Sequence, residues 1–174
     1  MKKSFLVISA VAALLVATAA CFAQGNGRGT AKLTLDGATV TVEYGTPSLK
    51  GRAVKDLLGS VGAGDFWRLG ADKSTTFSTT KDLQFGDVTV PKGEYSLWAE
   101  KQSDGSWKLV FNKQHGQWGT QHDPAQDFAS VPLKQETEGK SAEKVTITLE
   151  KENGAGELSV QWGDMEMTAN FSVK

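Results

Sequence analysis

The chain is poor in the residues on which much metal and nucleophile chemistry depends. It has one cysteine and two histidines among its 174 residues. The cysteine, Cys21, lies in an N-terminal segment that we expect to be removed, which would leave no disulfide, cysteine nucleophile or thiolate metal ligand. No His-x-x-x-His pattern or cysteine pair occurs, so we expect no cofactor and no zinc site. Calcium held by loop oxygens stays open, because it leaves only a weak sequence pattern.

Long apolar runs are also absent after residue 20. Lys2 and Lys3 precede an apolar stretch over residues 5–20, which is typical of a secretory signal peptide. The pattern predicts a signal peptide over residues 1–23 and an extracytoplasmic protein, periplasmic or secreted, with no transmembrane span after its removal. The alternative is a lipoprotein whose lipid is carried by Cys21, in which case the chain would be an envelope-tethered assembly subunit.

Neither sign of charge dominates. Residues 1–23 hold two lysines and no acids, so their removal leaves 19 − 2 = 17 basic and 20 acidic residues, a net charge of −3. This mild value argues against nucleic acid or an anionic membrane surface as a partner.

Turn residues divide the rest of the chain into short alternating segments. Two-residue turns at Asp36-Gly37, Gly86-Asp87 and Gly163-Asp164 each place the flanking apolar residues opposite one another. At residues 97–111 a three-residue loop, Ser103–Gly105, does so better, and it puts Trp98 on the face opposite Leu97 and Ala99.

These hairpins predict an all-β fold. We expect a flexible leader over 24–29 and a single antiparallel β-sandwich of about nine strands over 30–174. One strand is expected over Ser74–Thr80, one or two short helices at 53–60 and after Asp123, and a solvated loop at 135–144. Trp107 and Trp162 fall on apolar strand faces and are expected in the core.

Several segments resemble a known family. They are VEYGTPSLKGR (42–52), FWRLGADKSTT (66–76), VPKGEYSLW (90–98), WKLVFNKQHGQWGT (107–120) and HDPAQDFASVPLK (122–134). In this order they resemble the secreted bacterial family called domain of unknown function 2911, over nearly the whole chain after residue 30. The chain departs from the family at His122, where members often have an aromatic residue, and at Asp72, where they often have Asn. The resemblance implies a compact extracytoplasmic β-domain and no established activity.

Catalytic candidates are few. His115 and His122 flank one loop, and either could act as a general base with a nearby carboxylate such as Asp123. No Gly-x-Ser-x-Gly elbow accompanies them, so a hydrolase-like enzyme is the alternative hypothesis, and two exposed loop histidines are the simpler interpretation.

Binding is the function that this residue inventory favours. The candidate ligand-binding residues are Tyr44, Arg52, Trp67, Arg68, Trp98 and Trp118. The expected partner is a small molecule, a glycan, a peptide or an envelope protein, with a carboxylated ligand among the small molecules. Two alternatives stay open at this point. Loops could bury Trp98, and Arg52 and Arg68 could pair with carboxylates of their own chain at Glu43, Asp72 or Asp123.

Overall fold

The computed structural model describes residues 26–174, apart from the side chains of residues 138–140. The predicted signal peptide, Cys21 and the first residues of the predicted leader lie outside the described residues. The predicted leader over residues 24–29 overlaps strand β1 (Gly27–Leu35), because Gly27 already pairs with Thr46.

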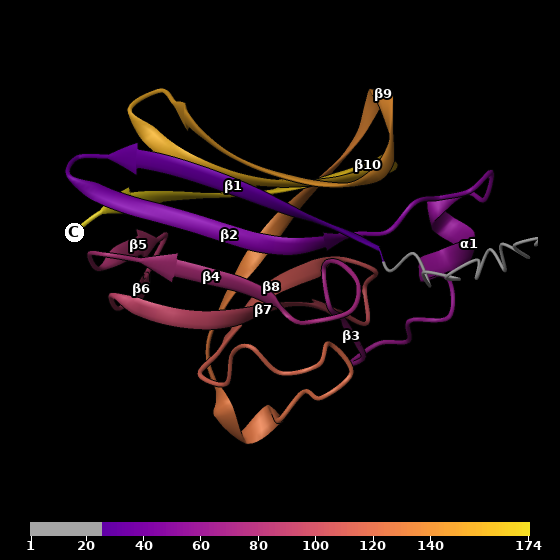
Figure 1. Ribbon diagram of the computed structural model, residues 1–174, viewed down its shortest axis with the longest axis horizontal. Coiled ribbons are helices and arrows are strands. Elements are labelled where there is room, and N and C mark those ends of the chain that lie inside the picture. Colours follow the sequence, from indigo (N-terminus) through magenta and orange to yellow (C-terminus); the bar gives the residue numbers. More distant parts are fainter. Residues whose placement is uncertain (1–25) are drawn as a thin grey trace, which may run out of the picture.

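The fold is an antiparallel β-sandwich, as predicted, built from one sheet that folds over on itself. Strand β9 (Asp127–Glu152) pairs with β8 along its first residues and with β10 (Ala155–Val173) further on, so it passes from one layer to the other (Figure 1). The first layer holds, in order, β1, β2 (Ala38–Thr46), β4 (Thr75–Thr79), β7 (Gly93–Lys101) and β8 (Trp107–Asn112), with the short β3 (Phe66–Trp67) also on β7. The second layer continues through β10 to β5 (Leu83–Phe85) and β6 (Val88–Val90).

Three predicted hairpin registers are confirmed. Across Asp36-Gly37, Leu35 pairs with Ala38, and Asp36 and Gly37 both have positive φ, as a type I′ turn requires. The Gly86-Asp87 hairpin and the three-residue loop at Ser103–Gly105 also have the predicted pairings.

The Gly163-Asp164 hairpin prediction is wrong. Here β10 runs on without reversing, and Gly163 lies at an irregularity in its pairing with β9. The chain reverses instead at Asn153-Gly154, where both residues have positive φ and Ala155 pairs with Glu152. Asn-Gly is a stronger type I′ signal than Gly-Asp, so the sequence held the correct turn.

The solvated loop predicted at 135–144 is also wrong. These residues belong to β9, with Gln135 paired to Met167 and Ala142 paired to Gly163. The backbone pairs with β10 on both sides of an irregularity between Thr137 and Ala142, although Gln135, Glu136 and Thr137 are exposed, because strand pairing needs only the backbone groups.

The core lies between the two layers. Phe111 of β8 is completely buried and contacts the rings of Phe77 and Phe85 at centroid distances of 5.5 and 5.3 Å. Trp107 and Trp162 are buried there, as predicted.

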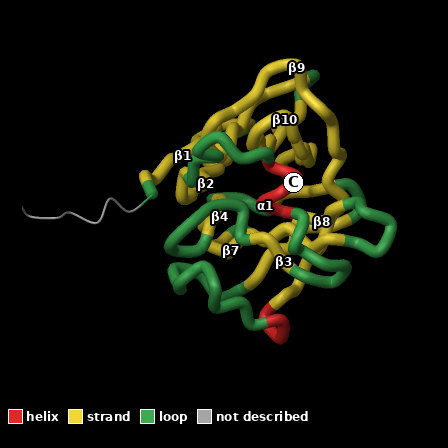
Figure 2. Tube along the Cα trace, turned by 90° about the vertical axis from the view of Figure 1, so that its right-hand side faces the viewer, coloured by secondary structure: helices red, strands yellow, loops and turns green. Residues whose placement is uncertain are grey.

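Within residues 26–174, helix is limited to two short segments, both near predicted positions. The helix α1 (Val54–Leu58) lies at one end of the sandwich, where Val54 and Leu58 join the core (Figures 1 and 2). A 3-10 turn, η1 (Pro124–Gln126), interrupts the connection from β8 to β9, and the Asp123 side chain accepts a hydrogen bond from the amide of Ala125 there.

Candidate functional site

Two segments that precede and follow α1 in the sequence meet beside this helix. One follows β2 and contributes Lys50 and Arg52, and the other follows β3 and contributes Arg68. Together with Trp67 and Trp162 they line a cleft of about 350 Å³, which we call the cationic cleft. Two of the segments that carry the family resemblance, 42–52 and 66–76, therefore contribute to one site.

The cationic cleft has a charge of one sign. Lys50, Arg52 and Arg68 line it, and none of its described lining residues is acidic. Arg52 is exposed and donates from Nε to the carbonyl of Leu49 at 2.9 Å, which directs its guanidinium without neutralising it.

Neither arginine makes an ion pair with another described residue. The expectation that Arg52 and Arg68 pair with Glu43, Asp72 or Asp123 is therefore wrong. No side-chain hydrogen bond from Arg68 is found within residues 26–174 either, although this side chain is half-buried. Charge-assisted hydrogen bonds are the strongest that a guanidinium makes, so this site has donors available for an anion.

Backbone geometry positions both segments. Lys50 and Gly51 have φ of 52° and 76°, and the carboxylate of Glu143 accepts the amide of Lys50 at 2.9 Å. At the second segment, Thr75 Oγ1 donates to the carbonyls of Arg68 and Leu69. These contacts hold the two corners of the cleft to β9 and β4.

Gly45 explains how the two segments come so close. A Cβ added at Gly45 would lie 2.1 Å from the carbonyl oxygen of Ala71, a distance that no side chain tolerates. The backbone of β2 therefore lies directly on the Gly70-Ala71 corner, and only glycine fits there.

Tryptophans form one wall of the cationic cleft. Trp67 stacks on Trp162 with ring centroids 5.7 Å apart and planes 9° apart. Both are buried, and Trp162 Nε1 has no hydrogen-bond partner among the described residues. A buried donor without a partner costs about 1–3 kcal/mol.

A second cleft adjoins the first. It has a volume of about 320 Å³, and we call it the aromatic cleft. Its lining consists of Phe66, Trp67, Arg68, Trp98, Gly119, Thr120 and His122. Trp67 and Arg68 line both clefts and thus form the wall between them.

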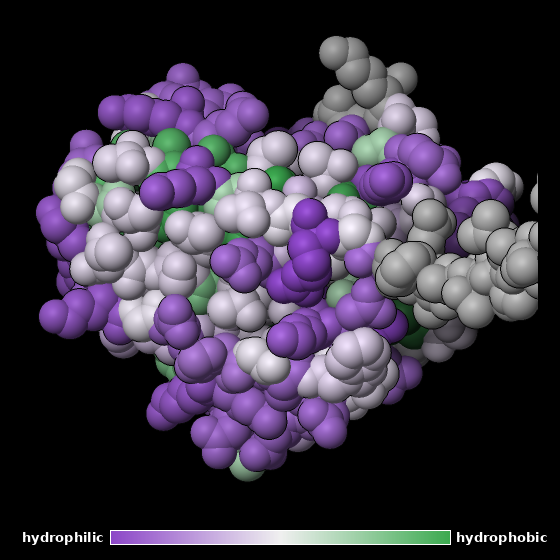
Figure 3. Space-filling model, viewed as in Figure 1, coloured by the Kyte–Doolittle hydropathy of each residue, from purple (hydrophilic) through white to green (hydrophobic). Residues whose placement is uncertain are grey.

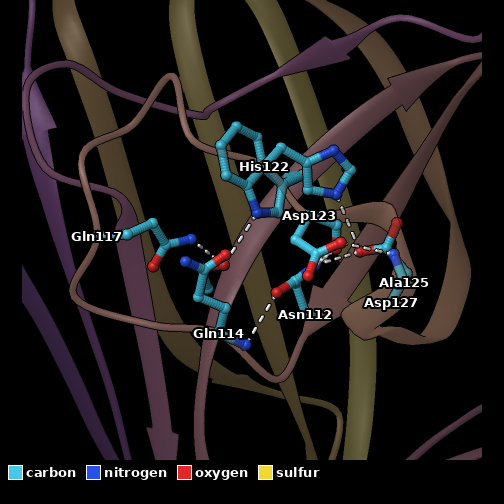
Figure 4. A network of polar contacts seen from close by, with 9 residues as sticks. Asn112, Gln114, Gln117, His122, Asp123, Ala125 and Asp127 are labelled. Carbon is cyan, nitrogen blue, oxygen red and sulfur yellow. Dashed lines mark hydrogen bonds and ion pairs between the residues drawn. The ribbon is translucent and has the colours of Figure 1, made fainter.

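The loop that joins β8 to β9 buries Trp98, so this side chain does not offer a large surface to a ligand. Only 3% of it is exposed, and Nε1 donates to Ser96 Oγ at 2.9 Å. The amide of Gln117, from the loop, donates to the same hydroxyl at 3.2 Å (Figure 4). The prediction that Trp98 lies on the face opposite Leu97 and Ala99 is compatible with this position, and the alternative that loops cover that face is confirmed.

His122 belongs to the same polar network. Its Nε2 lies 2.9 Å from Asp127 Oδ1, and Asn112 Nδ2 donates to that oxygen at 2.7 Å (Figure 4). The imidazole lies between the rings of Phe66 and Trp98, with centroid distances of 4.1 and 4.6 Å. The carboxylate partner is thus Asp127, whereas the candidate Asp123 caps η1.

The two histidines do not form one site. His115 is largely exposed and lies 3.6 Å from Glu94, away from the aromatic cleft that His122 lines. Within residues 26–174, no hydroxyl is hydrogen-bonded to either imidazole. A base and an orienting carboxylate are therefore present at His122, but an activated nucleophile is not part of the described arrangement.

Two ligand-binding candidates lie elsewhere. Tyr44 is buried in the core, and its hydroxyl donates to the carbonyl of Ile147 at 3.3 Å. Trp118 is 51% exposed on the β8–β9 loop and lines neither cleft. That loop forms the lower edge of the molecule in Figure 1, and this edge is strongly hydrophilic in Figure 3.

Sequence reasoning missed Lys50, Trp162 and Asp127 as site residues. Lys50 lies in the Lys-Gly-Arg corner, whose basic character was visible in the sequence. Nothing local marks Trp162, since it alternates regularly within a strand and contributes both to the core and to the cleft.

Two features are absent from the part of the chain that the structure describes. Among the residues that the structure covers, no three His, Cys, Asp or Glu side chains converge in a way that could hold a metal ion. None of the helices in that same part of the chain has the length and apolarity needed to cross a membrane.

Comparison with known proteins gives a family. No curated protein and no solved structure matches the chain. Residues 27–171 match the family described as "Protein of unknown function (DUF2911)". The match spans both segments of the cationic cleft and the loop that lines the aromatic cleft. The chain belongs to this family of proteins of unknown function.

Proposed function

We propose that the chain is an extracytoplasmic binding module whose cationic cleft holds the carboxylate or phosphate group of a small ligand. The observation that carries the proposal is the convergence of Lys50, Arg52 and Arg68 on one cleft, with none of their charged groups ion-paired to another described residue. The extracytoplasmic location is supported by the signal-peptide pattern of residues 1–23.

Like charges gathered at one place repel one another, and this repulsion is relieved when an anion binds between them. Two of the chain's three arginines line this cleft. Arginine is the side chain best suited to planar anions, because its donors form a rigid fork that matches a carboxylate or phosphate. Arg52 is held by the carbonyl of Leu49, so part of the ordering cost of binding is met before the ligand arrives.

The fold around the cleft is suited to binding rather than to a moving catalytic site. Trp67 and Trp162 are fixed in the core by their stacking, and Gly45 locks the Gly70-Ala71 corner against β2. A ligand with an anionic group would satisfy the guanidinium donors that line the cleft.

The experiment is a calorimetric titration of residues 24–174 with acetate and with inorganic phosphate at low ionic strength. The substitutions Arg52→Gln and Arg68→Gln each remove a charge that the cleft needs, and we expect each to weaken anion binding by about tenfold or more. Arg28→Gln is the matched control, because Arg28 is the third arginine and lies outside both clefts. Equal binding by the Arg28 and Arg68 variants would contradict the proposal, as would the absence of binding for both anions.

A further inference from the structure

We infer that the aromatic cleft is a second subsite of the same site and holds the aromatic ring of an aryl anion, whose acidic group lies on Arg68. This inference rests on the proposed function of the cationic cleft. It adds the chemical class of the ligand, which is an aromatic carboxylate or an aryl phosphate.

The first argument is continuity between the clefts. Trp67 and Arg68 line both of them, so an anionic group bound to Arg68 lies at the edge of the aromatic cleft. Arg68 is also fixed at this boundary, because a Cβ added at Gly119 would lie 2.8 Å from Arg68 Cδ. The arginine stem therefore packs on the backbone of the β8–β9 loop, and this packing places the side chain between the two clefts.

The second argument is the chemistry of the lining. Phe66, Trp67, Trp98 and the imidazole of His122 supply four rings. Aromatic rings prefer tilted or offset contacts with other aromatic rings, which is how these rings already contact one another.

The third argument concerns the polar groups that line the aromatic cleft besides Arg68, which are few. Trp98 Nε1 is already bonded to Ser96, and His122 Nε2 is paired with Asp127. Thr120 supplies the one hydroxyl among the described lining residues. A sugar ring needs several hydrogen-bond partners around its edge, whereas an unsubstituted aromatic ring needs none, so this lining favours the aromatic ring.

The test compares ligands that differ only by the ring. Acetate is paired with phenylacetate, and inorganic phosphate is paired with phenyl phosphate, in calorimetric titrations of residues 24–174. We expect the phenyl compound of each pair to bind about tenfold more tightly, because burial of the ring adds to the anion contact. Benzyl alcohol, which has the ring without the charge, is expected to bind far more weakly than either phenyl anion.

A variant then locates the ring. Thr120 is exposed and lines the aromatic cleft, so Thr120→Tyr fills the cleft without removing a core contact. We expect this variant to lose the tenfold gain from the ring and to bind acetate and phosphate as the unaltered protein does. Thr34→Tyr, at an exposed position of β1 outside both clefts, is the matched control and keeps the gain. Thermal unfolding of both variants checks that the fold is retained.

The possible results separate this inference from the proposed function. Equal affinities within each pair would overturn the aromatic subsite and leave the anion site standing. A ring gain that survives Thr120→Tyr would also overturn it, because the ring would then bind elsewhere. If no anion binds at all, the proposed function fails and the inference fails with it.

Discussion

The two faces of the β7–β8 hairpin are buried in different ways. Phe111 and Leu109 point into the space between the layers and are covered by apolar side chains from both layers. Trp98 and Val110 are buried as deeply on the opposite face but lie outside that core. They are covered by the β8–β9 loop, which polar side chains hold in place (Figure 4).

The difference shows where a site can form in this fold. The apolar face has its partners within the sandwich and needs no further contact. The loop-covered face is closed by a few directed hydrogen bonds, and a loop that runs over a sheet leaves hollows at its edges. The aromatic cleft is one of these hollows, between the loop residues Gly119 and Thr120 and the strand residues Phe66 and Trp98.

The largest effect is expected from Phe111→Ala in the apolar face. Phe111 is completely buried and contacts several rings, so its removal leaves a cavity and should lower the free energy of unfolding by about 3–5 kcal/mol. Urea unfolding followed by tryptophan fluorescence measures this. A loss below about 1 kcal/mol would mean that the core can close over the missing ring, against the packing described above.

A smaller and more local effect is expected from Asn112→Ala in the loop-covered face. Asn112 donates to Asp127 Oδ1 and to the carbonyl of Asp123, and its own oxygen accepts the amide of Gln114. Loss of these bonds leaves buried polar groups unpaired and should lower the free energy of unfolding by about 1–3 kcal/mol.

Amide hydrogen exchange distinguishes this from a general loss of stability. Exchange should accelerate first in the loop at 113–123, while amides of β4 and β7 keep their relative protection. The exposed Gln121, replaced by Ala, serves as the control and should leave the exchange pattern unchanged. Uniform acceleration across both faces in the Asn112 variant would show that the faces do not differ in this way.

The smallest effect concerns the acidic residues that face one another across β9 and β10. Glu157 lies directly opposite Glu150, and burial raises the pKa of Glu157, with further contributions from Glu152, Glu166 and Glu150. A carboxyl whose pKa is raised by folding binds its proton more tightly when folded, so its ionisation destabilises the fold at neutral pH. Stability from this group is gained as the pH falls through the raised pKa.

Glu157→Gln should therefore stabilise the fold at pH 7, by about a few tenths of a kcal/mol, since like charges face each other across the strands. The advantage should vanish in acid, below the pKa of an unfolded glutamate, where the native carboxyl is protonated in both states. Thermal unfolding across the pH range measures it, with Glu43→Gln on β2 as the control. A Glu157 variant that is less stable than the native chain at pH 7 would contradict the assigned repulsion.

The sequence predicts the local parts of this fold well. The Asp36-Gly37 hairpin follows from turn chemistry and alternation alone, since both act within ten residues. The same reasoning failed at Gly163-Asp164, where the alternation of apolar residues fitted a hairpin equally well. The turn lies instead at Asn153-Gly154, whose Asn-Gly pair is the stronger turn signal. The extended strand at 135–144 could not be told from a loop, because its polar side chains carry no apolar pattern.

The site was less predictable because it depends on long-range geometry. Arg52, Trp67 and Arg68 were identified as candidates, but only the close approach of β2 to Ala71 brings them to one cleft. The same limit applied to Trp98, whose burial depends on a loop that crosses back over its strand. Local pattern gives the residue types of a site, and tertiary contacts decide which of them meet.

The most direct test of the central claim follows the indole N–H of Trp162 by ¹⁵N–¹H NMR during a titration with phosphate or acetate. The chain has five tryptophans, so five indole signals can be followed, and Trp162→Phe identifies the relevant one. Trp162 lines the cationic cleft, whereas Trp118 lies outside both clefts. The account predicts a saturable shift of the Trp162 signal that is lost in Arg68→Gln, with the Trp118 signal unmoved. A Trp162 signal that stays unchanged at saturating anion, or a shift confined to Trp118, would contradict it.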